Sequence, residues 1–143
     1  MPVFERDNIR IYYEETGEGF PVLLFAPGGM RSAINYWHES DFNAIEKLKS
    51  DFHVIAMDQR NAGQSIAPVS GRDTWDTYTS DHISLLDHLG IETTHVMGGC
   101  IGGPYCLGMM KAAPGRVSLR TLVSMGVRIF DSSGTFTPAT RMV

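Results

Sequence analysis

An unbroken apolar run at residues 21–26 (PVLLFA) constrains the fold more than any other feature of the sequence. A short run without polar alternation is typical of a strand that is buried on both faces of a parallel sheet. The loop that follows it, Pro27-Gly28-Gly29, contains two glycines. We therefore expect this strand near the centre of an α/β fold.

Strand and helix patterns alternate along the rest of the chain. Two short strands are expected at residues 3–5 and 9–15, and further strands at 52–57, 94–97 and 119–125. A short helix is expected to start near Ser40 or Asp41, with Phe42, Ile45 and Leu48 on one face. A longer helix has an apolar face made of Trp75, Tyr78, His82, Leu85, Leu86 and Leu89, and Gly90 would end it.

This alternation predicts the fold class and the domain organisation. It implies a mostly parallel sheet with flanking helices and right-handed crossovers. A last helix should run from the glycine-rich segment at 98–102 to about Ala113, where Pro114-Gly115 ends it. We expect residues 1–130 to form part of a single core, and residues 131–143 to be an irregular tail leading toward a lid and a second half.

Composition excludes several classes of function. A net charge of -4 without any run of Lys or Arg argues against a nucleic-acid partner. No apolar stretch approaches the roughly 20 residues of a membrane helix, and the first residues do not form a secretory signal. The only cysteines, Cys100 and Cys106, match no metal motif, so we expect no metal or other cofactor. A cytoplasmic location is the default expectation.

The segment Gly98-Gly99-Cys100-Ile101-Gly102 lies between an expected strand and an expected helix. In such an elbow the central residue occupies a strained turn, and side chains two positions before or after it would collide with the backbone. Cys100 would then project at the positive end of the helix, which favours a thiolate. The N–H of Ile101 would point to where a tetrahedral oxyanion forms.

This segment has two other possible interpretations. It could be a glycine-rich turn that holds an inert, buried thiol. It could also be a nucleotide-binding turn, but that fingerprint needs G-x-G-x-x-G near the first strand and an acidic residue about 20 positions later. The glycines at 98–103 lie late in the chain and do not fit the fingerprint. Position and context therefore favour Cys100 as a nucleophile.

Three segments resemble motifs of the α/β-hydrolase family, in the family's order. Residues 23–30 (LLFAPGGM) resemble the strand and oxyanion loop, and residues 58–65 (DQRNAGQS) resemble the D-x-R-G-x-G-x-S loop. Residues 85–91 (LLDHLGI) resemble the end of the helix before the nucleophile strand. The resemblance runs from Ile9 to about Met125 and implies the N-terminal portion of an α/β-hydrolase fold. It implies a hydrolase that acts on an ester, lactone or thioester through a cysteine acyl-enzyme.

The sequence departs from the family pattern at several positions. Most small members have Ser at the elbow, where this chain has Cys100. Pro27 has no N–H, so the second oxyanion donor must be Gly28 or Gly29, and Gly28 matches the motif better. Asn61 stands where the family often has Gly, and it tolerates the same left-handed backbone.

The family's order of catalytic groups is nucleophile, acid and then His. Every histidine here precedes Cys100, and none matches the family's catalytic one: His38, His53, His82, His88 and His95. We expect His82 to be a core or interface residue, His38 to face a ligand or the surface, and Asp58 to have a structural role. A complementary C-terminal polypeptide, cleaved or separately encoded, is expected to supply the acid and the His.

Two alternatives to this hydrolase remain open at the level of sequence. The string Cys-Ile-Gly-Gly resembles the elbow of polyhydroxyalkanoate synthases, so an acyltransferase or polyester-synthase-like enzyme is one alternative. A non-catalytic binding subunit that keeps the hydrolase fold is the other. The expected ligand in each enzymatic case is a small-molecule acyl substrate.

Overall fold

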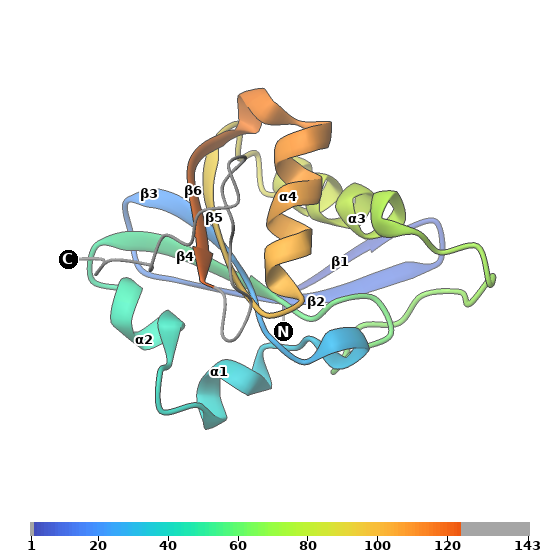
Figure 1. Cartoon of the computed structure of the whole chain (residues 1–143), viewed down its shortest axis with the longest axis horizontal. Coiled ribbons are helices and arrows are strands. Elements are labelled where there is room, and N and C mark those ends of the chain that lie inside the picture. The colour runs from blue at the N-terminus through green and yellow to red at the C-terminus, as the bar shows by residue number, and fades with distance from the viewer. Residues whose placement is uncertain (1, 124–143) are drawn as a thin grey trace, which may run out of the picture.

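The structure is a computed structural model that describes residues 2–123. The tail expected at residues 131–143 lies outside that range. The elements are shown in Figure 1. They are the strands β1 (Val3–Arg6), β2 (Ile9–Thr16), β3 (Phe20–Phe25), β4 (Phe52–Met57), β5 (Thr94–Gly99) and β6 (Val117–Val123), the helices α1 (Asn35–Glu39), α2 (Ala44–Leu48), α3 (Trp75–His88) and α4 (Gly102–Ala112), and two 3-10 turns at Gly29–Arg31 and Pro114–Arg116.

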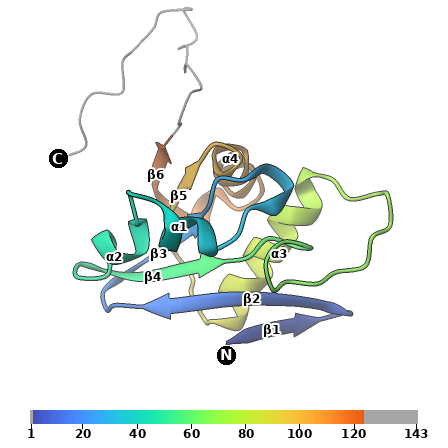
Figure 2. The same cartoon turned by 90° about the horizontal axis from the view of Figure 1, so that it is seen from below.

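The strands form a mixed sheet in the order β1-β2-β4-β3-β5-β6. Figure 2 shows this order, from β1 at one edge to β6 at the other. The β3 strand pairs in parallel with both β4 and β5, so that Leu23 lies beside Ile55 and Val96. The β6 strand continues the parallel part, whereas β1 and β2 are antiparallel. The predicted α/β class, with a mostly parallel sheet and flanking helices, is confirmed.

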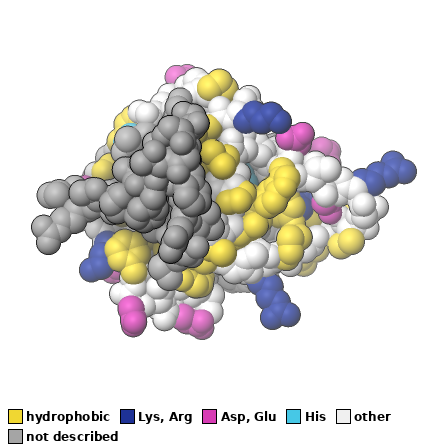
Figure 3. All heavy atoms as spheres, viewed as in Figure 1, with side chains coloured by type: hydrophobic (Ala, Val, Ile, Leu, Met, Phe, Trp, Pro, Cys, Tyr) yellow, Lys and Arg dark blue, Asp and Glu magenta, His cyan; other side chains and the backbone are white. Residues whose placement is uncertain are grey.

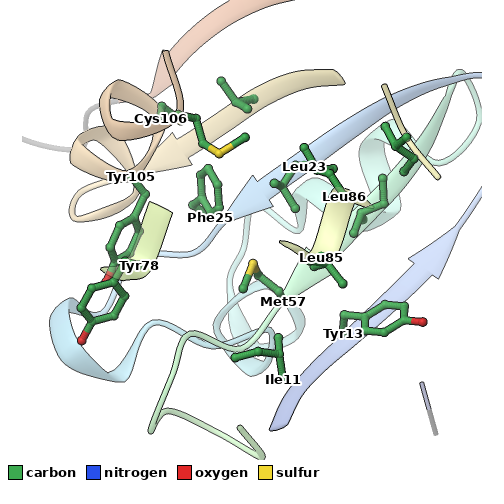
Figure 4. Packing of buried hydrophobic residues seen from close by; sticks show 14 of the residues in the cluster. Ile11, Tyr13, Leu23, Phe25, Met57, Tyr78, Leu85, Leu86, Tyr105 and Cys106 are labelled. Atoms are coloured by element: carbon green, nitrogen blue, oxygen red, sulfur yellow. The ribbon is translucent and has the colours of Figure 1, made fainter. Parts of the chain in front are cut away.

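The side chains of β3 alternate between two hydrophobic cores, one on each face of the sheet. Leu23 and Phe25 lie in the core beneath α3 and α4, which Figure 4 shows from close by. Val22 and Leu24 lie in the second core, which α1 and α2 cover with Trp37 and Ile45. Every residue from Val22 to Ala26 is buried. The unbroken apolar run therefore belongs to a strand that is covered on both faces, as predicted.

The apolar face predicted for α3 is correct along most of its length. Tyr78, His82, Leu85 and Leu86 are all buried. Trp75 is an exception, because 54% of its surface is exposed at the start of the helix. Figure 3 shows hydrophobic side chains gathered on the face that carries α3 and α4. The helix ends before Gly90, whose positive φ of 68° is a conformation that glycine adopts without strain.

Several element boundaries differ from the sequence-based expectation, most of them by one or two residues. The helix expected from Ser40 or Asp41 instead starts at Ala44, because the side chain of Asn43 caps it by accepting the N–H of Glu46 at 3.2 Å. Phe42 lies outside the helix and is 46% exposed. The last strand begins at Val117, two residues before the expected start. Residues 124–125 of that expected strand lie outside the described range.

Among residues 2–123, no helix is both long and apolar enough to cross a membrane.

Candidate active site

Cys100 lies at the sharp turn between β5 and α4. Its φ of 53° is in the left-handed region, which residues with a side chain rarely occupy. The carbonyl of Cys100 accepts the N–H of Gly103 at 3.0 Å, which closes the turn. The residue is exposed. Cys100 is therefore accessible to solvent at the N-terminus of an 11-residue helix, where backbone N–H groups and the helix dipole favour a negative charge.

Gly98 and Gly102 have no room for a side chain. A Cβ atom on Gly98 would lie 2.3 Å from the carbonyl oxygen of Gly102. A Cβ atom on Gly102 would lie 2.4 Å from the carbonyl oxygen of Phe25, on the neighbouring strand β3. Both contacts are with backbone, which cannot move aside as a flexible side chain can. Gly98 thus lets the start of α4 approach β5, and Gly102 lets it approach β3.

The loop after β3 lies at the same edge of the sheet as Cys100. Phe25 pairs with Gly98, so the loops that follow these parallel strands emerge side by side. Gly28 has a φ of 126°, which only glycine adopts readily, and its carbonyl accepts the N–H of Arg31 at 3.0 Å. Within residues 2–123, no backbone acceptor takes up the N–H of Gly28 or of Ile101.

A cavity of about 290 Å³ lies between the loop after β3, the end of β5 and α1. Pro27 and Gly99 contribute from the two strand ends. Most of its lining is aromatic or aliphatic, and the complete set is Pro27, Tyr36, Trp37, Ser40, Asp41, Phe42, Met97 and Gly99. An apolar group of moderate size fits such a lining.

Asp58 has a structural environment, as the sequence suggested. One carboxylate oxygen accepts the N–H of Ile34 at 2.8 Å, and the other accepts the N–H of Gln64 at 2.7 Å. Burial raises the pKa of the Asp58 carboxyl, and these two hydrogen bonds oppose that shift. A Cβ atom on Gly63 would lie 2.2 Å from the same carboxylate. Asp58 therefore organises the backbone of two loops.

A buried ion pair was missed by the sequence-based interpretation. The guanidinium of Arg60 contacts both carboxylate oxygens of Asp81 in α3, at 2.7 and 2.9 Å, and contacts Asp73 at 3.0 Å. Arg60 is 5% exposed and Asp81 is 1% exposed. An Arg in the D-x-R loop and an acidic residue on an otherwise apolar helix face were the available signals. Neither signal identifies the partner.

The five histidines have partners away from Cys100. His82 is fully buried, bonds Oε1 of Gln59 through Nε2 at 2.7 Å and packs on Phe25. This placement confirms a core role. His38 is a surface residue, because 44% of its side chain is exposed, and its Nε2 lies 3.2 Å from a carboxylate oxygen of Glu14. The rings of the remaining three are engaged in other contacts: His53 with Glu15, His88 with Phe4 and Tyr13, and His95 with Phe20 and Phe52.

The second cysteine has a different environment from the first. Cys106 is fully buried in α4, among the side chains of the core shown in Figure 4. Burial raises the pKa of its thiol to about 12. It is therefore protonated and inaccessible at neutral pH. In the described part of the chain, no three His, Cys, Asp or Glu side chains are arranged to hold a metal ion.

Comparison with known families settles which family this geometry belongs to. The family model of the alpha/beta hydrolase fold matches residues 21–140. The chain belongs to the α/β-hydrolase fold family. This is the family that the three sequence motifs predicted.

Several α/β-hydrolase relatives are similar to this chain. RutD of Azorhizobium caulinodans, named provisionally as a carbamate hydrolase, is 33% identical over 87% of this chain and 44% of its own length. The solved structure of Est816, described as an N-acyl homoserine lactone degrading enzyme, has a TM-score of 0.69 and 28% identity, over 86% of this chain and 45% of that one. A thermophilic esterase from Thermogutta terrifontis has a TM-score of 0.69 and 27% identity, over 80% and 40%. The chain thus spans less than half the length of these relatives.

Proposed function

We propose that this chain is the nucleophile-bearing part of a cysteine-dependent α/β-hydrolase that acts on an ester, lactone or thioester. The observation that carries the proposal is the exposed thiol of Cys100 at a φ of 53°. Backbone strain of this kind persists at sites where a side chain must be presented in a fixed direction. The glycine contacts at 98 and 102 support the same interpretation.

In the proposed reaction, the thiolate of Cys100 attacks the carbonyl carbon of the substrate. A C–S bond forms, and the carbonyl electron pair moves to the oxygen. The N–H groups of Ile101 and Gly28 then stabilise the oxyanion, a contribution worth about 10²–10³ in rate per donor. Collapse of this intermediate expels the alkoxide or thiolate with the electron pair of the broken bond and leaves an acyl-enzyme; the leaving group takes a proton from the protonated base or from solvent. Water hydrolyses that acyl-enzyme with the help of a general base.

The substrate class draws support from the relatives and from the cavity beside the elbow. The compared proteins include an enzyme described as degrading an N-acyl homoserine lactone and a protein described as an esterase. The cavity of about 290 Å³ that begins at Pro27 and Gly99 has a mostly apolar lining. An acyl group with an aliphatic or aromatic portion is therefore the proposed substrate type.

We further propose that a complementary C-terminal polypeptide supplies the catalytic acid and the His. Each histidine of residues 2–123 is engaged in the core or on the surface away from the elbow. The β6 strand has β5 as its strand partner in the described part of the sheet, and it leaves one parallel edge for pairing. A further strand at that edge would carry its exit loop to the same end of the sheet as Cys100.

Trapping of the acyl-enzyme tests the nucleophile. The protein, with any polypeptide that copurifies, is mixed with p-nitrophenyl acetate, and the release of p-nitrophenolate is followed together with the mass of the Cys100 peptide. We expect an acetyl group on Cys100 in the parent protein. The corresponding peptide of Cys100→Ala should carry none. Cys106→Ala is the matched control and should release p-nitrophenolate and acetylate Cys100 as the parent protein does. A parent protein that binds acyl compounds without any acetyl-cysteine would instead be a binding subunit.

Copurification tests the division of labour. Residues 1–143 carrying an affinity tag should recover a polypeptide that contains an Asp and a His, and steady turnover of a thioester should require both components. Residues 1–143 that are soluble, monomeric and catalytically competent alone would contradict this proposal. The base would then have to be sought among the histidines of this chain.

A further inference from the structure

Ser32 closes the loop that contains Gly28. Its hydroxyl donates to the carbonyl of Ala26 at 2.6 Å, across the base of the loop. Its own N–H donates to the carbonyl of Gly29 at 3.1 Å, on the opposite side. Ser32 is completely buried. Ser32 thus fixes the entry of the segment Pro27-Gly28-Gly29 through its side chain and the exit through its backbone.

A second set of hydrogen bonds attaches this loop to the next one. The carbonyl of Ser32 accepts the N–H of Gln59 at 3.0 Å, and the N–H of Ile34 donates to the carboxylate of Asp58 at 2.8 Å. Asp58 is itself attached to β2, since its N–H donates to the carbonyl of Tyr12 at 3.0 Å. The loop after β3 is therefore held from within by Ser32 and from outside by Asp58.

We propose that Ser32, anchored through Asp58, is a positioning residue that holds the N–H of Gly28 in the direction needed for the oxyanion. This inference rests on the proposed function of Cys100. Gly28 and Gly29, at φ values of 126° and 58°, have the widest conformational freedom of any residue type. Without the Ser32 hydroxyl, the two glycines can relax to other conformations. A donor displaced by about 1 Å loses on the order of 100-fold in rate.

Two reactions of the same thiol separate positioning from a general structural effect. Acylation by p-nitrophenyl acetate forms a C–S bond and passes through an oxyanion before p-nitrophenolate leaves with the C–O electron pair. Alkylation by iodoacetamide also forms a C–S bond, but iodide leaves directly with the C–I electron pair and no oxyanion forms. In both reactions the thiol proton passes to solvent or to the base. Only acylation needs the Gly28 N–H.

The decisive variant is Ser32→Ala, measured in the protein as purified with any polypeptide that accompanies it. We expect the acylation rate of Cys100 to fall about 10- to 100-fold, while the alkylation rate changes less than about twofold. Thr94→Val is the matched control. Thr94 is completely buried, and its hydroxyl also donates to a backbone carbonyl, that of Pro21 near the start of β3, at 3.1 Å. It should leave the ratio of the two rates unchanged.

The outcomes distinguish this inference from the proposed function. A parent protein that is alkylated but not acylated at Cys100 would refute the proposed function. A parent that is acylated, with Ser32→Ala slowing both reactions equally or neither, would overturn the positioning role alone. If Ser32→Ala does not fold, Asp58→Asn decides. This variant keeps the size of the side chain but removes the negative charge that accepts the N–H groups of Ile34 and Gln64. It should lower the acylation rate of Cys100 more than its alkylation rate.

Discussion

At the scale of the single residue, Cys100 has a backbone conformation that costs on the order of 1–3 kcal/mol for a residue with a side chain. The surrounding structure must offset this cost. Gly102 lets the start of α4 pack directly against the backbone of Phe25, and the N–H of Gly103 satisfies the carbonyl of Cys100. The elbow is therefore stabilised beside the thiol by one close packing contact and one hydrogen bond.

The two cysteines should differ sharply in reactivity. Iodoacetamide at neutral pH is expected to label Cys100 in the folded protein, because this thiol is exposed at a helix N-terminus. Cys106 should react only after unfolding, since it is fully buried and burial raises its pKa to about 12. Peptide mapping by mass spectrometry measures both sites in one sample. Preferential labelling of Cys106 in the native protein would contradict the elbow geometry.

Three glycines allow a controlled test of packing at the elbow. Gly98→Ala and Gly102→Ala should each lower the free energy of unfolding by at least about 1–3 kcal/mol, because the new Cβ meets backbone atoms. Gly103→Ala is the control, since its Cβ would meet nothing within 4 Å. It should be neutral or stabilising by up to about 1 kcal/mol, because Ala has the higher helix propensity. Urea denaturation measures the free energy of unfolding of the three variants. Equal values for all three would refute the predicted effect of packing at the elbow.

These residues differ in how far the sequence could predict them. The elbow glycines and Cys100 were identifiable because a strand, a turn and a helix are all encoded within a few consecutive positions. Ser32 was not identifiable. Its hydroxyl bonds to Ala26 and its carbonyl to Gln59, and the second partner is brought near only by the pairing of β3 with β4. A lone serine in a loop carries no pattern that reveals such a role.

At the scale of elements, the loop at residues 58–65 is joined to α3 by the buried pair of Arg60 and Asp81. Asp81→Asn leaves the buried guanidinium with Asp73 as its remaining carboxylate partner, and that side chain is 25% exposed. The variant should therefore lower the free energy of unfolding by up to about 3–5 kcal/mol, the range for a buried pair that loses one partner. The double variant Arg60→Met with Asp81→Leu should lose clearly less, because no charge remains buried.

The surface pair of Lys49 and Glu46 provides the control for this ion pair. Its atoms are 2.7 Å apart, but both side chains are largely exposed to solvent. Glu46→Gln should leave the free energy of unfolding nearly unchanged. Thermal unfolding monitored by circular dichroism compares all these variants. An Asp81→Asn protein as stable as the parent would show that Arg60 finds another partner.

The sequence predicted strands better than short helices. The strands β3, β4 and β5 are read from apolar runs whose burial follows from composition alone. Helix α1 was missed, because Asn35, Tyr36 and Trp37 are weak helix formers and the helix has only five residues. Its conformation depends on Trp37 packing into the second core. No local pattern contains that information.

At the scale of the whole molecule, the sheet separates two cores, and the larger one contains a neutral histidine. His82 is fully buried between α3 and β3, and burial together with the nearby charge of Arg60 lowers its pKa to about 3. In the unfolded chain its pKa returns to about 6.5. Above pH 6.5, both states are neutral at this position. Between pH 6.5 and 3, only the unfolded state takes up the proton.

Stability should therefore fall as the pH is lowered from about 6.5 toward 3, by up to about 1.4 kcal/mol per pH unit from His82. Urea denaturation at several pH values measures this slope. His82→Gln should have a lower stability at pH 7 but a shallower slope below pH 6.5. The raised pKa of Asp58 acts in the opposite direction, since it favours the protonated, folded state. Identical slopes in the parent and the variant would contradict a buried neutral His82.

The order of strands in the sheet differs from their order in the chain, and this has a consequence for folding kinetics. The strands β3 and β5 are neighbours in the sheet, but β4 and α3 lie between them in the sequence. The β1–β2 hairpin needs only its own local turn, so it can form early. The contact of Gly102 with Phe25 joins parts of the chain that are far apart in the sequence, so the loop that it closes makes it slow to form. We therefore expect the elbow geometry around Cys100 to be acquired after this hairpin, once β3 and β5 have paired.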